Sequence, residues 1–354
     1  MKKTSVVRQM PRRFAIVGAG MAGIACARTL HQAGHQVQVF EQSRGYGGRM
    51  ATRDSAFGTF DLGVQYFTVR DARFARALDT VPGLCRPWSA SAVHVLDAMG
   101  RVVEAAPPSH EPHWVPTPGM NALVRRWAEP LHTSGQVALQ TRVTRIERDA
   151  LDGTRWQLRT SGEEEAQHVH AGFDAVLLAL PAADAAELLT RSGLAPTLEG
   201  ALERVQVAPC WTLMVAYPLA AQPGLITLGP QWNAAHSVHH RVAWLARESS
   251  KPGRGLVERW TVHASPAWSH EHLADDPERV QAKLLKAFAE ITNIRATPAH
   301  VEVQRWRSAK TLQPLGRPYL WDDVSGIGLC GDWCLGHRVE DAFISGLELA
   351  LALA

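Results

Sequence analysis

The sequence predicts an α/β fold with two domains, of which one is discontinuous and the other is inserted into it. Three observations predict this arrangement. A strand–turn–helix–strand unit stands at 13–41, three strand-like runs occupy 210–264, and a glycine-bearing strand, loop and helix follow at 327–354. This order indicates one domain built from both ends and part of the middle of the chain.

The first unit begins with the apolar strand "RFAIV", continues through a glycine turn into a helix that Gly34 closes, and returns in the strand "QVQVFEQ". Its glycines Gly18, Gly20 and Gly23 spell GxGxxG. In a dinucleotide-binding turn the first glycine allows the tight bend, the second lets the backbone approach a pyrophosphate, and the third lets the helix pack on the strand. The alternative is a glycine-rich helix start that packs on a sheet for steric reasons only.

Glu41 lies 18 residues after Gly23, at the end of the second predicted strand. A carboxylate in that place accepts hydrogen bonds from both ribose hydroxyls and repels a 2′-phosphate. The helix that starts near Met21 and Ala22 offers free N–H groups and the positive end of its dipole to phosphates. Together these features predict a bound dinucleotide.

Two further segments favour FAD over NAD. In "RGYGGRMATR" the glycines Gly47 and Gly48 permit a tight bend, and Arg49 can reach phosphate oxygens. In the C-terminal "GLCGDW…VEDAFISG", Asp332 can accept from ribityl hydroxyls, and a helix starting near 340–342 can aim N–H groups at the flavin ring. The alternative for Arg49 is a surface salt bridge, and the alternative for the terminal helix is an ordinary amphipathic helix.

The middle of the chain reads as an inserted α+β domain on an antiparallel sheet. Hairpins are predicted to turn at Met99–Gly100 and at Asp152–Gly153. The runs "CWTLMVAYP", "RVAWLARES" and "LVERWTVHA" are expected to pair antiparallel, and a helix is expected to start with Asp276 as N-cap. The domain boundaries predicted are 12–75, 114–190 and 296–354 for the FAD-binding domain, and 76–113 and 191–295 for the substrate domain.

Composition narrows the class of protein. The 354 residues carry a net charge of only +3, which predicts no nucleic-acid partner. No apolar run approaches the roughly 18–20 residues that span a bilayer, so no membrane association is predicted. The five cysteines form no disulfide framework, which predicts a reducing compartment and a cytoplasmic location. Residues 1–11 are predicted to be a disordered leader.

The motifs "IVGAGMAG", "GGRMATR", "DLGVQYF", "FDAVLLALP" and "GDW…GHRVEDAFISGLELA" resemble the flavin-containing amine oxidase superfamily. Within it the chain is most similar to the renalases, over nearly its whole length, and "DLGVQYF" is the most specific part. This resemblance implies a two-dinucleotide-binding-domain flavoprotein with a Rossmann-like domain that holds FAD without a covalent bond. It also implies oxidation of 2- or 6-dihydro isomers of NAD(P)H, with electrons passed to molecular oxygen.

The motifs and the resemblance together name a set of cofactor-binding residues. Val143 is implied to contact the adenine through its backbone. The alternative for Gln65 and Tyr66 is hydrogen bonding within their loop and core packing. The full set is Gly18, Gly20, Met21, Ala22, Gly23, Glu41, Gln42, Gly48, Arg49, Met50, Gln65, Tyr66, Val143, Gly331, Asp332, Glu340, Asp341 and Ala342.

A dihydronicotinamide already carries a transferable hydride, so the sequence predicts no acid–base residue, because the flavin carries the chemistry. The predicted substrate-pocket residues instead stack and orient, and they are Tyr66, Trp306, Arg241 and His240 with its neighbours His236 and His239. No metal site is predicted, since no cysteine or acid completes the histidine run.

One departure argues against an ordinary amine oxidase. Many of those enzymes carry a lysine beside the flavin on a strand that corresponds to "CWTLMVAY", and that run has Trp211 and Thr212 but no lysine. An amine oxidase acting on a small amine remains the alternative function. A flavoprotein without turnover is a third possibility.

Overall fold

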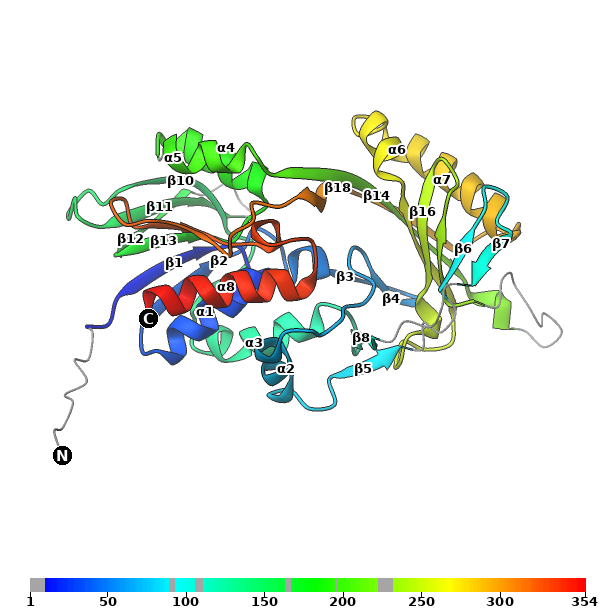
Figure 1. Ribbon diagram of the computed structural model, residues 1–354, viewed down its shortest axis with the longest axis horizontal. Coiled ribbons are helices and arrows are strands. Elements are labelled where there is room, and N and C mark those ends of the chain that lie inside the picture. Colours follow the sequence, from blue (N-terminus) through cyan, green and yellow to red (C-terminus); the bar gives the residue numbers. More distant parts are fainter. Residues whose placement is uncertain (1–9, 89–92, 106–110, 163–166, 195, 222–231) are drawn as a thin grey trace.

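The computed structural model describes residues 10–88, 93–105, 111–162, 167–194, 196–221 and 232–354 (Figure 1). The predicted disordered leader falls almost wholly outside the described residues. Two large sheets lie at opposite ends of an elongated molecule, and the N- and C-terminal segments share the same end (Figure 1).

The first sheet has six strands in the order β19-β20-β13-β1-β2-β9. Neighbouring strands run parallel except at the edge pair β19–β20. The C-terminal strand β20 is therefore only one strand away from β1, which confirms that both ends of the chain build one domain. The strands are β1 Arg13–Val17, β2 Gln36–Phe40, β9 Val137–Ala138, β13 Ala175–Leu178, β19 Leu320–Asp322 and β20 Ile327–Leu329.

Helices cover one face of this sheet and a three-stranded meander covers the other. Because alternate side chains of a strand point to opposite faces, Phe14 and Ile16 pack with the helices, while Ala15 and Val17 pack with the meander. On the first face lie α1 Met21–Gln32, α3 Ala122–Thr133 and α8 Val339–Leu353, and on the second lie β10 Arg142–Arg148, β11 Trp156–Ser161, β12 Gln167–Phe173, α4 Ala182–Ser192 and α5 Pro196–Leu202.

The second sheet has seven strands in the order β18-β14-β17-β16-β15-β6-β7, all antiparallel except β15–β6. One of its faces packs on helix α7 through Leu213 and Val262, and the other face turns toward the first domain. The elements are β6 Val93–Leu96, β7 Val102–Ala105, β14 Gln206–Tyr217, β15 Ala234–Ser237, β16 Val242–Arg247, β17 Glu258–Ala264, β18 His300–Gln313, α6 Pro266–Glu271 and α7 Pro277–Thr292.

Short elements connect the two sheets. The hairpin β3–β4 precedes α2. Strand β5 pairs with β8, and both contribute side chains to the core on the helical face of the first sheet. They are β3 Thr52–Ser55, β4 Gly58–Asp61, α2 Ala72–Asp79, β5 Cys85–Trp88 and β8 His113–Pro116, together with the 3₁₀ turns η1 Gly48–Met50, η2 Pro218–Ala221, η3 Glu248–Ser250 and η4 Asp332–Cys334.

The structure confirms the predicted opening unit, both hairpins, the antiparallel trio and the Asp276 cap. It departs from the expected boundary at residue 296, because β18 pairs along nearly its whole length with β14 of the second sheet. Likewise, Trp88 packs in the core of the first domain, so that among the described residues of the expected 76–113 piece only β6 and β7 join the second sheet.

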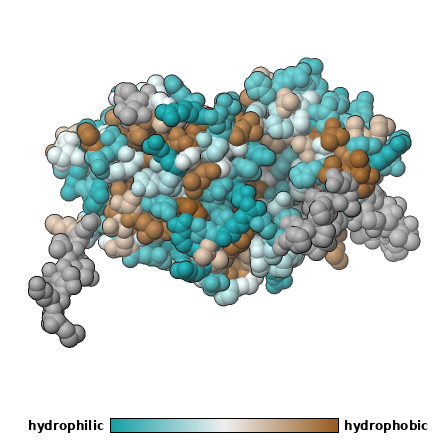
Figure 2. Space-filling model, viewed as in Figure 1, coloured by the Kyte–Doolittle hydropathy of each residue, from teal (hydrophilic) through white to brown (hydrophobic). Residues whose placement is uncertain are grey.

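The face of the molecule drawn in Figure 2 is mostly hydrophilic, with smaller hydrophobic patches toward both ends. Among the described residues, none of the helices combines the length and apolarity needed to cross a bilayer.

Helices α1 and α8 touch at Gly346, where an added Cβ would lie 2.1 Å from the carbonyl oxygen of Ala22. We expect Gly346→Ala to lower the free energy of unfolding by about 1–3 kcal/mol, because the two helices must move apart. Gly200→Ala is the matched control, since a Cβ at this helical glycine meets nothing within 4 Å. The control should gain about 0.5–1 kcal/mol from helix propensity. Denaturant unfolding measures both, and equal effects would contradict the close α1–α8 contact.

Candidate functional site

The glycine turn between β1 and α1 leaves no room for side chains. Gly18 has a φ of +106°, and an added Cβ there would lie 2.6 Å from the carbonyl oxygen of Ala179. A Cβ at Gly23 would lie 2.0 Å from the carbonyl oxygen of Gly18. Gly20 is different, because the nearest atom to its Cβ position is 3.9 Å away. The backbone at Gly20 is therefore open to the approach of another molecule.

The first turn of α1 is free to receive an anion. Its N-cap is Gly20, which supplies no capping side chain, and the turn holds no acidic residue. The N–H groups and the positive dipole end at Met21 and Ala22 thus meet no carboxylate from the helix itself. This is the local chemistry that binds a phosphate.

Glu41 is nearly buried, with 9% of its surface exposed, directly after β2. Its Oε2 accepts from the Ala19 N–H at 2.8 Å and its Oε1 accepts from the Ser43 N–H at 2.8 Å. These two bonds fix the carboxylate against the glycine turn. Each oxygen keeps a second lone pair that a ribose hydroxyl can reach.

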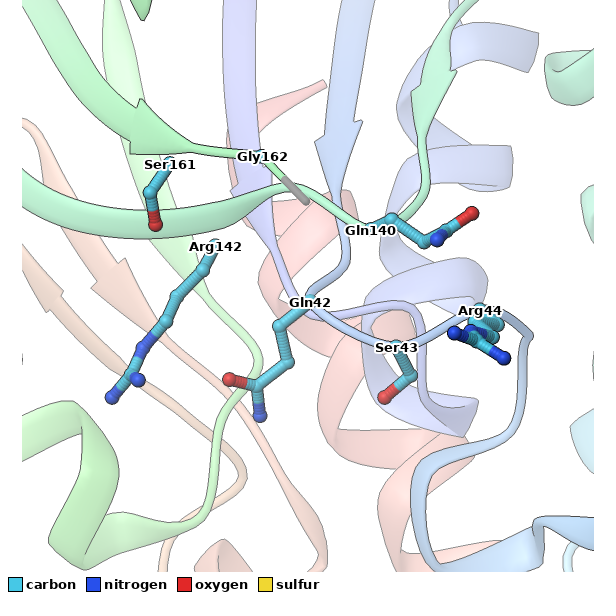
Figure 3. A pocket seen from close by; sticks show the side chains of 7 residues that line it. All are labelled: Gln42, Ser43, Arg44, Gln140, Arg142, Ser161 and Gly162. Atoms are coloured by element: carbon cyan, nitrogen blue, oxygen red, sulfur yellow. The ribbon is translucent and has the colours of Figure 1, made fainter. Parts of the chain in front are cut away.

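A hollow of about 390 Å³ opens beside Glu41 (Figure 3). Gln42 and Arg142 line it and extend in the same direction in Figure 3. Val143, the expected adenine contact, follows Arg142 in β10 and is 8% exposed. The lining residues are Gln42, Ser43, Arg44, Gln140, Arg142, Ser161 and Gly162.

Arg49 and Asp332 form an ion pair across 283 residues of sequence. Arg49 Nη1 donates to Asp332 Oδ2 at 2.9 Å, Nη2 bonds the other oxygen, and Thr311 Oγ1 donates to Oδ2 at 3.2 Å. Gly47, just before η1, donates its N–H to the carbonyl oxygen of Ala19 at 3.0 Å. Gly48, Arg49 and Met50 of η1 therefore lie beside the glycine turn together with Asp332. Arg49 does form a salt bridge, but not the surface one considered as its alternative, because its partner is a predicted site residue with only 6% of its side chain exposed.

The acids at the start of α8 are committed to backbone groups. Glu340 Oε1 accepts from the N–H groups of Arg70 and Asp71 at 2.7 and 2.6 Å. Asp341 Oδ2 accepts from the Arg338 N–H at 2.8 Å. Their carboxylates therefore brace loops. The Ala342 N–H already donates to the Arg338 carbonyl oxygen at 3.2 Å, so this end of α8 can offer a ligand only the backbone N–H groups of Val339 and Glu340.

The segment from Asp61 to Tyr66 separates the two domains. Gln65 Nε2 donates to the carbonyl oxygens of Asp61 and Gly63 at 2.6 and 3.1 Å, and its Oε1 accepts from Lys251 Nζ at 2.9 Å. The Gln65 amide thus makes the loop hydrogen bonds that stood as the alternative to cofactor contact. By contrast, the backbone N–H groups of Gly63, Gln65 and Tyr66 meet no acceptor within the described part of the chain.

A row of side chains crosses the second sheet and faces this segment. Strand register places Thr212, His263, Trp244 and His236 side by side on β14, β17, β16 and β15. Thr212 Oγ1 donates to the carbonyl oxygen of Leu62 at 3.0 Å, and His263 Nε2 lies 3.2 Å from the same oxygen. We call Thr212, His263, Trp244 and His236 the cross-strand row.

Tyr66 lies against aromatic and imidazole rings. Its ring centroid is 6.1 Å from that of Trp244 and 4.0 Å from that of His113, and Trp244 lies 4.6 Å from His236. Burial raises the pKa of Tyr66. The indole nitrogen of Trp244 is buried and has no hydrogen-bond partner among the described residues, so this wall retains a donor that a ligand can use.

The structure brings only some of the predicted pocket residues together. Trp306 packs beside Phe60 and Leu62, near the segment that carries Tyr66. Arg241 instead donates to the Lys283 carbonyl oxygen of α7 at 3.5 Å, and the His240 ring lies 4.5 Å from that of His239, tilted by 30°.

His239 in turn pairs with Glu290 of α7 at 3.4 Å. Since α7 covers the opposite face of the sheet, Arg241 and His240 belong to that side and not to the wall around Tyr66. Of His236, His239 and His240, only His236 lies beside Trp244 in the wall around Tyr66. His239 and His240 come after the end of β15, where side chains no longer alternate between the two faces of the sheet.

Sequence reasoning did not find Thr212, His263 or Lys251 as site residues. Thr212 and His263 each sit in a predicted strand, but which residue of a strand faces its neighbour depends on register. Lys251 follows η3, where a lysine reads as an ordinary surface residue. No local signal distinguishes these three positions.

His263 gives a prediction on pH. Burial lowers its pKa from about 6.5 to about 4, against the opposing contact with the Leu62 carbonyl. Between these values the unfolded chain binds a proton that the folded chain does not, so stability is full above pH 6.5 and falls as the pH drops toward 4. The full shift is worth roughly 3 kcal/mol, and we expect about 2 kcal/mol because the ring is partly exposed.

The test compares unfolding free energies at pH 7 and pH 4.5 for wild type and His263→Gln. The variant should lose less stability on acidification, and the exposed His270→Gln should follow wild type. If His263→Gln and wild type lose the same unfolding free energy between pH 7 and pH 4.5, His263 is not the responsible group.

Comparison with known proteins places these features in a family. Residues 16–80 match the NAD(P)-binding Rossmann-like domain, and residues 104–354, well over half of the chain, match the flavin containing amine oxidoreductases. A 42-residue segment is 57% identical to the L-amino-acid oxidase of Crotalus adamanteus, covering 12% of this chain and 8% of that protein. A 58-residue segment is 44% identical to a 4,4'-diapophytoene desaturase of Staphylococcus haemolyticus, covering 16% of this chain and 12% of that protein. These matches thus span about a tenth of the curated relatives.

Solved structures resemble the chain over nearly its whole length. A protein described as a protoporphyrinogen oxidase from Exiguobacterium sp. 255-15 has a TM-score of 0.74 at 15% identity, covering 97% of this chain and 99% of that one. Cyclohexylamine oxidase from Brevibacterium oxydans IH-35A has a TM-score of 0.71 at 14% identity, with coverage of 97% and 99%. At these identities the likeness shows the shared fold.

Proposed function

The chain belongs to the flavin containing amine oxidoreductase family, and we propose that it oxidises 2- or 6-dihydro isomers of NAD(P)H with FAD and molecular oxygen. The observation that carries this proposal is the wall formed by Tyr66, at the end of the Asp61–Tyr66 segment, with His113, Trp244 and His236. Its rings suit a planar heterocycle, and none of these four side chains is the carboxylate or lysine that deprotonation of an amine would use.

The cofactor part of the proposal rests on residues that fit a dinucleotide. The open backbone at Gly20 and the uncapped start of α1 suit a pyrophosphate, Glu41 suits ribose hydroxyls, and the hollow beside Gln42 suits the adenosine end. Asp332, bonded to Arg49, and the start of α8 suit the flavin end of the cofactor. When bound, the flavin supplies the hydride acceptor and transfers electrons to oxygen.

The chain's own groups then act by position and charge. Tyr66 and Trp244 hold a planar substrate in the orientation that hydride transfer requires, and the indole N–H of Trp244 donates to its polar edge. Discrimination between isomers follows from which ring carbon this wall presents, since no proton need be removed.

An amine substrate is the second candidate, and the family and the cyclohexylamine oxidase fold support it. The buried Lys251 is a cation near Gln65, but its three bonds leave it no donor for a substrate or a bridging water. We also propose non-covalent FAD and a cytoplasmic location, supported by five free cysteines, of which Cys26, Cys330 and Cys334 are buried.

Anaerobic mixing of the flavin-loaded protein with a small donor panel tests the substrate. We expect 2- or 6-dihydro-NAD to bleach the flavin absorbance at least 100-fold faster than 4-dihydro-NAD or cyclohexylamine. Tyr66→Ala should slow bleaching by about 10-fold or more through lost orientation, whereas Arg241→Ala, on the opposite face, should leave it unchanged. Bleaching by amines alone supports the second candidate, and no bleaching by any donor indicates a flavoprotein without turnover.

Glu41→Gln tests the cofactor site. Losing charge-assisted acceptance from ribose hydroxyls should weaken FAD binding by about 10- to 100-fold, or roughly 1.4–2.8 kcal/mol. Asp54→Asn, an exposed acid on β3, serves as control and should bind FAD like wild type. Flavin titration followed by fluorescence measures both, and heat denaturation should release all flavin into the filtrate. Flavin that stays with the denatured chain contradicts non-covalent binding.

A further inference from the structure

Four charged side chains are fully enclosed behind the Asp61–Tyr66 segment. Asp61 ends β4 of the first domain, whereas Glu248, Lys251 and Arg254 come from one loop after β16 of the second. Their side chains are all 0% exposed. We call these four residues the charge cluster. Burying a charged side chain costs free energy unless the charge is paired. The hydrogen bonds of each side chain in the cluster therefore show which groups it holds in place.

Every donor of Lys251 is used. Its ammonium donates to Asp61 Oδ2, Glu248 Oε1 and Gln65 Oε1, each at 2.9 Å. The third bond leaves the cluster and reaches the site segment. Because the Gln65 oxygen faces Lys251, its amide nitrogen must face the carbonyl oxygens of Asp61 and Gly63.

Three carbonyl oxygens of the segment are thereby bonded. Gln65 holds those of Asp61 and Gly63, while Thr212 and His263 hold that of Leu62. The N–H groups of Gly63, Gln65 and Tyr66 are left without acceptors among the residues described. A short segment that fixes its acceptors and keeps its donors is suited to hold an electron-rich ring.

We propose that Lys251 is a positioning residue that, through Gln65, holds the N–H groups of Gly63, Gln65 and Tyr66 toward the reacting ring of the flavin. This inference rests on the function proposed above. It differs from a role as base or as water ligand, because the ammonium has no donor left. Lys251 then acts on the flavin by orienting backbone dipoles, which favour the reduced, more negative ring.

Arg254, a second cation bonded to Asp61, can be compared with Lys251. The Asp61 carboxylate pairs with Arg254 at 2.8 and 3.1 Å, and it accepts from Thr52 Oγ1 at 2.8 Å. Arg254 donates to Thr59, to Asp61 and to the Pro116 carbonyl oxygen. Arg254 is thus as buried as Lys251 and shares its counter-ion, but its bonds do not reach Gln65.

The experiment measures the two-electron midpoint potential of the bound flavin in Lys251→Met, Gln65→Leu and Arg254→Met. Lys251→Met and Gln65→Leu should each reduce the equilibrium constant for flavin reduction about tenfold, which lowers the potential by about 30 mV. Their double variant should show no larger shift than Lys251→Met alone. Arg254→Met should lose stability while keeping the wild-type potential, and Lys251→Arg should recover part of the shift.

Thr52→Val, which removes a different donor to Asp61, is the milder control and should keep the wild-type potential. If Lys251→Met or Arg254→Met does not fold, Gln65→Leu against Thr52→Val decides the question. An unchanged potential in Gln65→Leu, or equal shifts in Gln65→Leu and the control, overturns the inference while the proposed function stands. Wild-type protein that binds no flavin overturns the proposed function, and this inference with it.

Discussion

The ion pair between Arg49 and Asp332 is the contact on which the candidate site depends. It joins a turn near one end of the chain to a turn near the other, beside the glycine bend that begins α1. Asp332 is almost buried, with 6% of its side chain exposed, so losing Arg49 would leave a carboxylate with Thr311 as its remaining side-chain partner. The close α1–α8 contact at Gly346 is a second point at which the N- and C-terminal parts of the chain meet. A site shared between both ends exists only when both have folded into one sheet.

The second domain contacts this site through residues of β14 and β18 and through the loop after β16. The cross-strand row and the charge cluster both converge on the Asp61–Tyr66 segment, the first through the Leu62 carbonyl and the second through Gln65. These contacts are buried and polar, so each group is costly unless it is paired. The segment is therefore held as one rigid unit between the two domains, which is the arrangement a cofactor-and-substrate site needs.

Local chemistry made much of the first domain predictable. The strand–glycine turn–helix–strand unit follows from an apolar run, from three glycines in GxGxxG spacing, and from an acid at the end of a strand. Both hairpins follow from their turn residues, and the start of α7 follows from an aspartate before proline. Strands β12 and β18 could not be predicted in the same way, because both alternate polar and apolar residues weakly and take their stability from long-range pairing.

By itself the sequence determined the glycine turn, the acid at the end of the second strand, the family motifs and the antiparallel trio, because each depends on residues close together in the chain. Only the tertiary structure decided that Arg49 meets Asp332, that Gln65 bonds Lys251, and that His236 but not Arg241 or His240 joins the wall around Tyr66. Strand register and the placement of loops after a strand end set these contacts. Both are fixed by which elements pack together across the whole chain, and a local pattern carries no information about that choice.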